Sequence, residues 1–426
     1  MRRLLAISAI AGLLCAGCSS SGGTTPLVIG AIYPLSGAQG PGGIEEYHGV
    51  KLAVDMVNAS GGVAGRRVAL EALDVADQDS VPGAMQHLSQ SGTRLVIGSY
   101  GSTISAPAAR IAIAKGMLFW ETGAVGDMND NGRWMVGPPQ VAEPKSGAFF
   151  RVAPTGSSLG SAAISFMAKR YARAIHRRGS SLRYAVANVN DIYGRSVASG
   201  AIHEIHKLHL PFVGRFGYNP LRPHYAKLVR SLARARPDIL FVSAYINDGV
   251  GLRRAIVRHH LHLLGNIGSS SSYCMPAFGA RLGKEAVGVF ASDKPAAEYM
   301  APGGLDPAAR TLLQKAERSY QHRYHADMSA AALAGFSGAW ALLHFVLPHA
   351  ASATPSAVAS AARSLDLPKG TLPNGSGLRF GTSTKTASEN IHASSVIWEW
   401  VGVDKRAVVW PPRFATQKMQ VSSING

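Results

Sequence analysis

The chain of 426 residues contains little cysteine, with only Cys15, Cys18 and Cys274. Two of the three lie within the first 18 residues, so the remainder of the chain holds one thiol. A single thiol excludes a disulfide framework and a cysteine-based metal cluster. We therefore predict that Cys274 is a small side chain in or near the core.

Motifs of the common catalytic sites are also missing. No G-x-S-x-G pattern surrounds Ser102, Ser196 or Ser337, and the sequence has no H-E-x-x-H, no paired C-x-x-C and no P-loop. His203 and His206 would share one face of a helix, but no third metal ligand accompanies them, and a solvated helix surface is the plainer interpretation. We expect neither an enzyme nor a metal or cofactor site.

Acidic residues are few. The chain has 25 Asp and Glu against 43 Lys and Arg, which gives a formal net charge of +18. Between Lys169 and Arg258, 17 basic residues stand against four acidic ones. Such an excess attracts nucleic acid, anionic lipid or an acidic partner. The plainer interpretation is that arginines coat the solvent faces of several helices.

Charged residues are absent altogether from Met328 to Ala362. Residues 328–348 are long enough to cross a bilayer. The segment is rich in alanine, serine and glycine, it contains His344, and globular sequence follows it. We therefore predict a helix buried inside an α/β domain in place of a membrane span.

The N-terminus has the pattern of a targeting segment. Arg2 and Arg3 precede an apolar stretch, Leu4–Leu14, that is too short to span a bilayer. We exclude this segment from the fold. An exported chain is not expected to meet nucleic acid.

The targeting segment ends in CAGC, residues 15–18, followed by a Ser/Gly-rich run. This pattern resembles a bacterial lipobox, although Cys15 stands where a leucine is usual. The resemblance implies a signal peptide over residues 1–17, lipidation of Cys18, a flexible tether over 18–25 and attachment to a membrane of the cell envelope. An ordinary signal peptide is the alternative.

The rest of the chain alternates apolar strands with helical patterns in two series. The second series has strands at 183–190, 211–218, 238–245 and 263–270, whose starts are 28, 27 and 25 residues apart. This spacing is typical of βαβ units, so we predict two α/β lobes with doubly wound parallel sheets. Ligands bind such sheets beyond the carboxyl ends of the strands. The first series has expected strands at 26–36, 67–77, 94–99 and 117–121, with helices at 45–62, 82–91 and 105–115.

The order of the segments predicts a hinge of three crossings between the lobes. We expect the chain to build lobe 1 first, to cross near 149–155 and again near 288–295, and to end with a hairpin over 396–410 in lobe 2. A multi-stranded hinge suits closure around a ligand. The predicted boundaries are 26–150 for lobe 1, 151–292 for lobe 2, 293–380 for a return to lobe 1 and 381–426 for a return to lobe 2.

Seven segments form a pattern by their order and spacing along the chain: IGAIYPLSG (29–37), 45–70, RLVIGSYGSTISAPAARIA (94–112), FWETGAVGDM (119–128), FFRVAPT (149–155), NDIYGRS (190–196) and DILFVSAY (238–245). Together they resemble the type I periplasmic binding proteins of branched-chain amino acid and amide ABC transporters. The resemblance implies a monomer with a three-crossing hinge that captures a small polar ligand, such as an amino acid, an amide or a small carboxylate, for ABC permease subunits. A sensing module that docks on a membrane signalling partner is the alternative.

The resemblance also implies which residues contact the ligand. Ser102 would lie at a helix N-terminus, where free N–H groups and the helix dipole favour a carboxylate. Tyr193 and Tyr245 would cover the ligand from lobe 2. The full expected set is Ser102, Thr103, Gly123, Ala124, Val125, Tyr193, Tyr245 and Ser270.

Three positions depart from the family pattern. Val125 stands where a hydroxyl residue is frequent, and Gly42 stands where some relatives have an aromatic residue, which suggests a different or larger pocket. Ser270 stands where amino-acid binders commonly place an acid for the ligand's ammonium, and a buried ammonium without an anionic partner is costly. Candidates to replace that acid are Asp191, Asp248 and Glu121.

Overall fold

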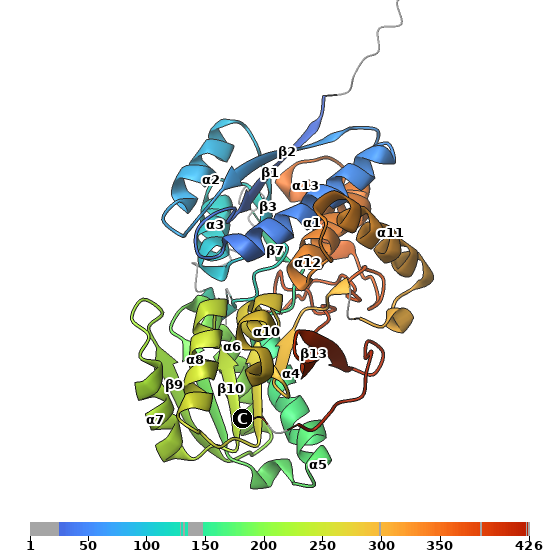
Figure 1. Cartoon of the computed structure of the whole chain (residues 1–426). Helices are drawn as coiled ribbons and strands as arrows, with labels where there is room; N and C mark the ends of the chain where they lie inside the picture. Colours follow the sequence, from blue (N-terminus) through green and yellow to red (C-terminus); the bar gives the residue numbers. More distant parts are fainter. Residues whose placement is uncertain are drawn as a thin grey trace, which may run out of the picture.

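Two α/β lobes, each built on its own sheet, lie one above the other in Figure 1. The computed structural model describes residues 25–127, 129–130, 133–134, 148–297, 300–383, 386–422 and 424. The predicted signal peptide and Cys18 lie outside the described residues.

Lobe 1 contains a five-stranded sheet in the order β2-β1-β3-β4-β7, with every neighbouring pair parallel. Side chains alternate between its two faces: Ile32, Val96 and Phe119 pack in one cluster and Ile97 and Trp120 in the other. The strands are β1 (Leu27–Tyr33), β2 (Val68–Asp74), β3 (Leu95–Gly98), β4 (Leu118–Glu121) and β7 (Ala148–Arg151), and the helices are α1 (Gly40–Ala59), α2 (Val81–Gln90), α3 (Ser102–Ala114), α11 (Pro307–Tyr324), α12 (Ala330–Trp340) and α13 (Pro355–Ser364).

Lobe 2 contains a seven-stranded sheet in the order β14-β13-β12-β11-β10-β8-β9. The five strands from β9 to β12 are parallel, and the predicted C-terminal hairpin adds β13 and β14 in the antiparallel sense. The strands are β8 (Tyr184–Val189), β9 (Phe212–Tyr218), β10 (Ile239–Ser243), β11 (Gly265–Ser269), β12 (Phe290–Asp293), β13 (Val396–Gly402) and β14 (Lys405–Trp410), and the main helices are α4 (Gly156–Phe166), α6 (Ile192–Lys207), α7 (Tyr225–Ala235), α8 (Ile246–Arg258), α9 (Ser270–Tyr273) and α10 (Pro276–Leu282). The prediction of two doubly wound lobes is confirmed.

The long apolar helix at Ala330–His349 has the 20-residue length of a membrane span, and an 18-residue window of it has a mean hydropathy of 1.7, but 78% of that window is buried inside the protein. Its first part, α12, lies directly against α1. A Cβ atom on Gly49 would lie 1.9 Å from the carbonyl oxygen of Ala332, and one on Gly335 would lie 2.1 Å from that of Glu46. The two backbones therefore touch, and the helix is a core element as the sequence predicted.

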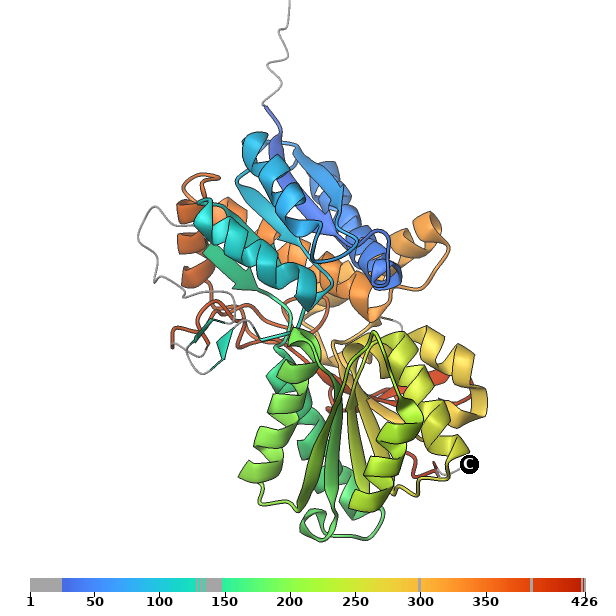
Figure 2. The ribbon, with the colours of Figure 1, turned by 90° about the vertical axis from the view of Figure 1, so that its left-hand side faces the viewer.

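The chain crosses a third time between α13 of lobe 1 and β13 of lobe 2, and the segments that join the lobes lie between them in Figure 2. This third crossing contains residues 388–390: the N–H of Arg151 donates to the carbonyl oxygen of Ser388 at 2.9 Å, and the N–H of Asn390 donates to that of Arg151 at 3.1 Å. The segment 149–155, expected to be only a crossing, begins as the edge strand β7 and leaves lobe 1 after Arg151. Arg151 pairs with Glu389 of the third crossing at 3.3 Å, and both side chains are buried. Burial raises the pKa of Glu389 to about 7, although the Arg151 charge opposes that rise.

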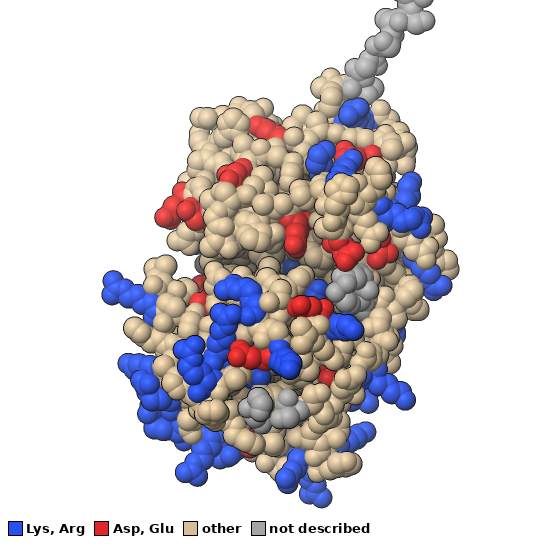
Figure 3. All heavy atoms as spheres, in the orientation of Figure 1, with Lys and Arg blue, Asp and Glu red and all other residues tan. Residues whose placement is uncertain are grey.

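Lysine and arginine side chains gather on the lower lobe, over α7 and α8 (Figure 3). A groove between these two helices is lined by the exposed residues Lys227, Arg230, Arg254 and Arg258. The basic excess therefore lies on solvent-facing sides of helices, which agrees with the plainer interpretation of the charge pattern.

Candidate functional site

A narrow cavity of about 40 Å³ lies between the lobes, where the carboxyl ends of both sheets face each other. Six of the eight residues expected at the ligand line it: Ser102, Gly123, Val125, Tyr193, Tyr245 and Ser270. Residues from both lobes close over this space. A ligand therefore needs the lobes to part before it enters.

The hydroxyl groups after β3 divide into two sets. Ser99 and Ser105 bond to each other at 2.7 Å, and Ser105 also donates to the buried carboxylate of Glu121. Ser102, the first residue of α3, lines the cavity, and its Oγ accepts the N–H of Gly126 at 2.9 Å. Thr103 accepts a hydrogen bond from Gln39 at 3.0 Å and does not line the cavity.

Glu121, at the end of β4, shapes the turn that follows. Its carboxylate accepts the N–H groups of Gly123 and Ala124, each at 2.8 Å. Burial raises the pKa of Glu121 to about 7, against these hydrogen bonds and the charge of Arg151. The N–H of Ala124 is thus used inside lobe 1, and Ala124 does not line the cavity.

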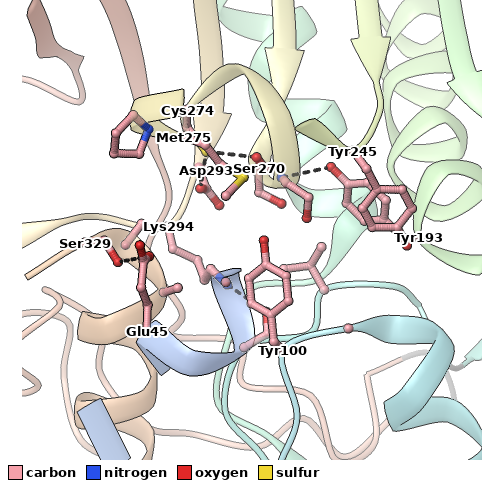
Figure 4. A pocket seen from close by; sticks show the side chains of 18 of the residues that line it. Glu45, Tyr100, Tyr193, Tyr245, Ser270, Cys274, Met275, Asp293, Lys294 and Ser329 are labelled. Carbon is pink, nitrogen blue, oxygen red and sulfur yellow. Dashed lines mark hydrogen bonds between the residues drawn. The ribbon is translucent and has the colours of Figure 1, made fainter. Parts of the chain in front are cut away.

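In lobe 2 the two predicted tyrosines lie side by side at the cavity (Figure 4), with ring centroids 5.2 Å apart. The hydroxyl of Tyr193 bonds to Ser269 at 2.8 Å and accepts the N–H of Ser271 at 3.2 Å. These bonds fix the ring of Tyr193 against the ends of the central strands.

The three acids that were candidates to pair with a ligand ammonium near Ser270 form hydrogen bonds outside the cavity. Asp191 caps α6 by accepting the N–H of Gly194 at 2.7 Å, and Asp248 accepts the hydroxyl of Tyr225 at 2.8 Å. Glu121 holds its own turn, as described above. None of the three lines the cavity.

A different acid, Asp293, lies next to Ser270. The register Ser269↔Ser292 places the two residues side by side at the ends of β11 and β12. Asp293 is 2% exposed, its Oδ2 accepts the thiol of Cys274 at 2.6 Å, and its Oδ1 has no hydrogen-bond partner among the residues that the structure describes. Burial raises the pKa of Asp293, and the charge of Lys294 opposes the rise.

Lys294 follows Asp293 and reaches across the cavity toward lobe 1 (Figure 4). Its ammonium donates to the carbonyl oxygen of Gly123 at 2.8 Å and lies 5.9 Å from the centre of the Tyr100 ring. The residue is 5% exposed. Sequence analysis missed this side chain, because nothing in the segment 288–295 indicates where a lysine at a strand end points.

Tyr100 occupies the space that Gly42 leaves open. A Cβ atom on Gly42 would lie 2.3 Å from Cζ of Tyr100. An aromatic ring is therefore present at this place, but it comes from the loop after β3 and not from position 42. Of the two expectations for this place, a different or a larger pocket, the Tyr100 ring contradicts the larger one, because it fills the space beside Gly42.

Two further charged side chains line the cavity. Glu45 of α1 accepts the hydroxyl of Ser329 at 2.7 Å, and burial raises the pKa of Glu45. Arg406 of β14 donates to the carbonyl oxygen of Cys274 and lies 5.4 Å from the centre of the Trp400 ring. Within the described ranges, no group of three or more His, Cys, Asp or Glu side chains could hold a metal ion.

Comparison with known proteins gives one consistent result. The profile of the family described as periplasmic binding protein matches residues 26–395. A curated relative, the Leu/Ile/Val-binding protein homolog 8 of Brucella suis, is 25% identical over 423 residues, which cover 99% of each chain.

Two solved structures have similar folds. The branched-chain amino acid transporter substrate-binding protein LivJ of Streptococcus pneumoniae, in complex with isoleucine, has a TM-score of 0.69 and 15% identity over 91% of this chain and 100% of that one. An ABC transporter solute-binding protein of R. palustris, in complex with benzoate, has a TM-score of 0.69 and 16% identity over 93% of this chain and 98% of that one. At these identities the likeness concerns the fold.

Proposed function

The chain belongs to the periplasmic binding protein family, and on that premise we propose that it captures a small carboxylate-bearing molecule between its lobes and delivers it to an ABC importer. The observation that carries the proposal is the cavity itself. It joins the N-terminus of α3 in lobe 1 to the tyrosine pair in lobe 2. One small molecule there would touch both lobes at once.

The lobe 1 side of the cavity suits a carboxylate. α3 is a helix of 13 residues that begins at Ser102, and its first intrahelical bonds are donated by Ile104 and Ser105 to the carbonyl of Gly101. The earlier N–H groups of a helix have no intrahelical acceptor, and together with the helix dipole they favour an anion. The Ser102 hydroxyl lies at the same place and adds a donor.

Binding and release follow from the two-lobe architecture. A ligand that bridges the lobes stabilises the closed arrangement over the open one, and the shift is set by its difference in affinity for the two states. Binding proteins of this family transfer solutes and do not transform them, so we propose no catalytic step.

The solved relatives support two ligand chemistries. One holds isoleucine, which carries an ammonium and a carboxylate, and another holds benzoate, which carries a carboxylate alone. A carboxylate is common to both, which supports that group as the one bound at α3.

We further propose that the mature protein is a monomeric lipoprotein of the cell envelope. Signal-peptide removal after residue 17 would leave Cys18 lipidated, with residues 18–25 as the tether to lobe 1. In membrane fractionation, the wild-type chain should sediment with membranes and Cys18→Ser should be soluble. An equal distribution of the two would overturn the anchor and leave the binding function untouched.

Isothermal titration tests the site with a matched pair of variants. Ser102→Ala should weaken binding of the best ligand from a panel of amino acids, amides and small carboxylates about tenfold, as expected for a charge-assisted hydrogen bond. Thr103→Val, one residue further along the same helix but off the cavity, should leave the affinity within twofold. Equal effects of the two changes would refute the assignment of the carboxylate to this turn.

The importer partnership needs a cellular readout. Deleting the gene should abolish uptake of the radiolabelled ligand at concentrations near its Kd, and a plasmid copy should restore that uptake. Unchanged uptake with an intact binding site would favour a sensing role over import.

A further inference from the structure

Lys294 brings a positive charge of the protein into the ligand cavity. Lys294 follows Asp293, the last residue of β12 in lobe 2, and its side chain extends toward lobe 1 (Figure 4). Its Nζ donates to the carbonyl oxygen of Gly123 at 2.8 Å. The Tyr100 ring covers one side of the ammonium at 5.9 Å. The ammonium therefore stands in the middle of the interlobe space, on the ligand side of both sheets.

The groups around this ammonium leave little negative charge for a second cation. The Gly123 oxygen and the Tyr100 ring are neutral. Glu46 lies close behind, but burial raises the pKa of Glu46 to about 8, so that carboxyl is mostly protonated at neutral pH. Asp293 is the acid next to Lys294 and already accepts the Cys274 thiol.

The position that would serve an ammonium on the ligand carries little net charge as well. Ser270 has no charge, and the neighbouring carboxylate of Asp293 is countered by the lysine that follows it in sequence. A ligand ammonium entering here would face the Lys294 ammonium at close range. Two like charges at such a distance repel strongly in a site shielded from water.

The walls around the charged groups are largely apolar or aromatic. Tyr100, Tyr193 and Tyr245 present rings, and Val125 and Met275 present aliphatic side chains. Such walls suit an apolar ligand body attached to one polar group. The polar partners available to that group include the α3 N-terminus with Ser102 on one side and Lys294 on the other.

We propose that Lys294 supplies from the protein the positive charge that an amino acid would bring as its own ammonium, so that the ligand is a small aromatic or branched aliphatic carboxylate without an α-amino group. This inference rests on the proposed function and narrows its ligand class. Lys294 would bond the ligand carboxylate when the lobes close, in exchange for or beside the Gly123 oxygen.

Matched ligand pairs that differ only in the amino group test the inference by isothermal titration of the full chain. The pairs are 3-phenylpropanoate with phenylalanine, and 4-methylpentanoate with leucine, with benzoate added as a further carboxylate. At least one carboxylate should bind ten times or more tightly than its amino acid. Tighter binding of the amino acids would overturn the inference, assign their ammonium to Asp293 and leave the proposed function standing. Binding of neither the carboxylates nor the amino acids would overturn both the inference and the proposed function.

Variants of Lys294 distinguish two roles for this residue: binding the ligand carboxylate, or only holding the two lobes together through its bond to Gly123. Lys294→Met should weaken the preferred carboxylate at least tenfold and move the ratio of carboxylate to amino-acid affinity toward the amino acid. Ethylammonium added to Lys294→Ala should restore part of the affinity by filling the emptied place. Lys115→Met, on the exposed surface of lobe 1, is the matched control and should change neither quantity. A latch would weaken both ligands of a pair equally, and that result would overturn the inference.

Discussion

The buried carboxyl of Glu46 makes the stability of the protein depend on pH in a direction that can be predicted. Glu46 is 0% exposed, its Oε1 accepts the hydroxyl of Thr122 at 2.6 Å, and its Oε2 has no hydrogen-bond partner within the described part of the chain. Burial raises the pKa of Glu46 from 4.5 to about 8, and the nearby charge of Lys294 only reduces that rise. The folded state therefore binds a proton that the unfolded state releases above pH 4.5.

The sign and the size of the effect follow from proton linkage. Stability is retained below the unfolded pKa and is lost as the pH rises from 4.5 to about 8, at up to about 1.4 kcal/mol for each pH unit. Glu46→Gln keeps the shape of the side chain and removes the titration. Relative to this variant, the wild-type protein should lose roughly 3–4 kcal/mol of unfolding free energy between pH 5 and pH 8.

Urea unfolding followed by circular dichroism measures this difference at pH 5, 6, 7 and 8 without ligand. Thr122→Val is the control, because it removes the hydroxyl that bonds to Glu46 but keeps the titrating carboxyl. That variant should be less stable at every pH, and its stability should fall with pH at least as steeply as that of the wild type, because the lost hydrogen bond had lowered the pKa of Glu46. A difference between wild type and Glu46→Gln that is the same at pH 5 and pH 8 would refute the reasoning.

Three further predictions concern the hinge, the core and the thiol. Glu389→Ala should destabilise the fold by about 3–5 kcal/mol in urea unfolding, because it leaves the buried Arg151 charge uncompensated; a loss below 1 kcal/mol would contradict this. Gly49→Ala should cost about 1–3 kcal/mol because its Cβ would lie 1.9 Å from a backbone oxygen of α12, whereas Gly83→Ala, which meets nothing within 4 Å, should be neutral or stabilising. Burial raises the pKa of the Cys274 thiol, so this thiol should react slowly with N-ethylmaleimide, and more slowly again when a ligand fills the cavity. Mass spectrometry of the Cys274 peptide measures both rates, and equal rates with and without ligand would contradict the assignment of the cavity.

Most of the fold could be predicted because it depends on local patterns. Strands such as β8 and β10 are apolar runs bounded by helical segments, and the regular spacing of the second series admits little besides a parallel sheet. The helix at Ala330–His349 was separable from a membrane span by its composition. The start of β7 was missed, because an edge strand that runs directly into a crossing has the same extended pattern as the crossing itself.

The site residues also divide into those that local patterns predict and those that depend on tertiary structure. Ser102 and the two tyrosines lie at helix N-termini that follow strand ends, where chain order alone brings them to the cavity. Lys294 and Asp293 were missed because their roles depend on the register of β11 and β12 and on a side chain that returns to the other lobe. The order of residues along the chain predicts neither the register of these two strands nor the direction of the Lys294 side chain.

Within the loops, hydrogen-bond competition separated neighbours that the sequence treats alike. Thr103 follows Ser102, yet its hydroxyl accepts from Gln39 on the far side of the turn. Gly123 and Ala124 both donate their N–H groups to Glu121, yet Gly123 lines the cavity, where its carbonyl oxygen accepts Lys294, and Ala124 does not. Which of two adjacent residues meets a ligand is decided by partners distant in sequence.

The contact between Gly42 and Tyr100 means that substitutions at these two positions, 58 residues apart, depend on each other during evolution. A side chain at 42 collides with the ring unless residue 100 is first made small, and a small residue at 100 leaves a void unless position 42 grows. Each single replacement thus passes through a less fit intermediate, which is sign epistasis between the two sites. Across homologues we expect an aromatic ring at one position or the other and rarely at both, so this pair should show strong covariation.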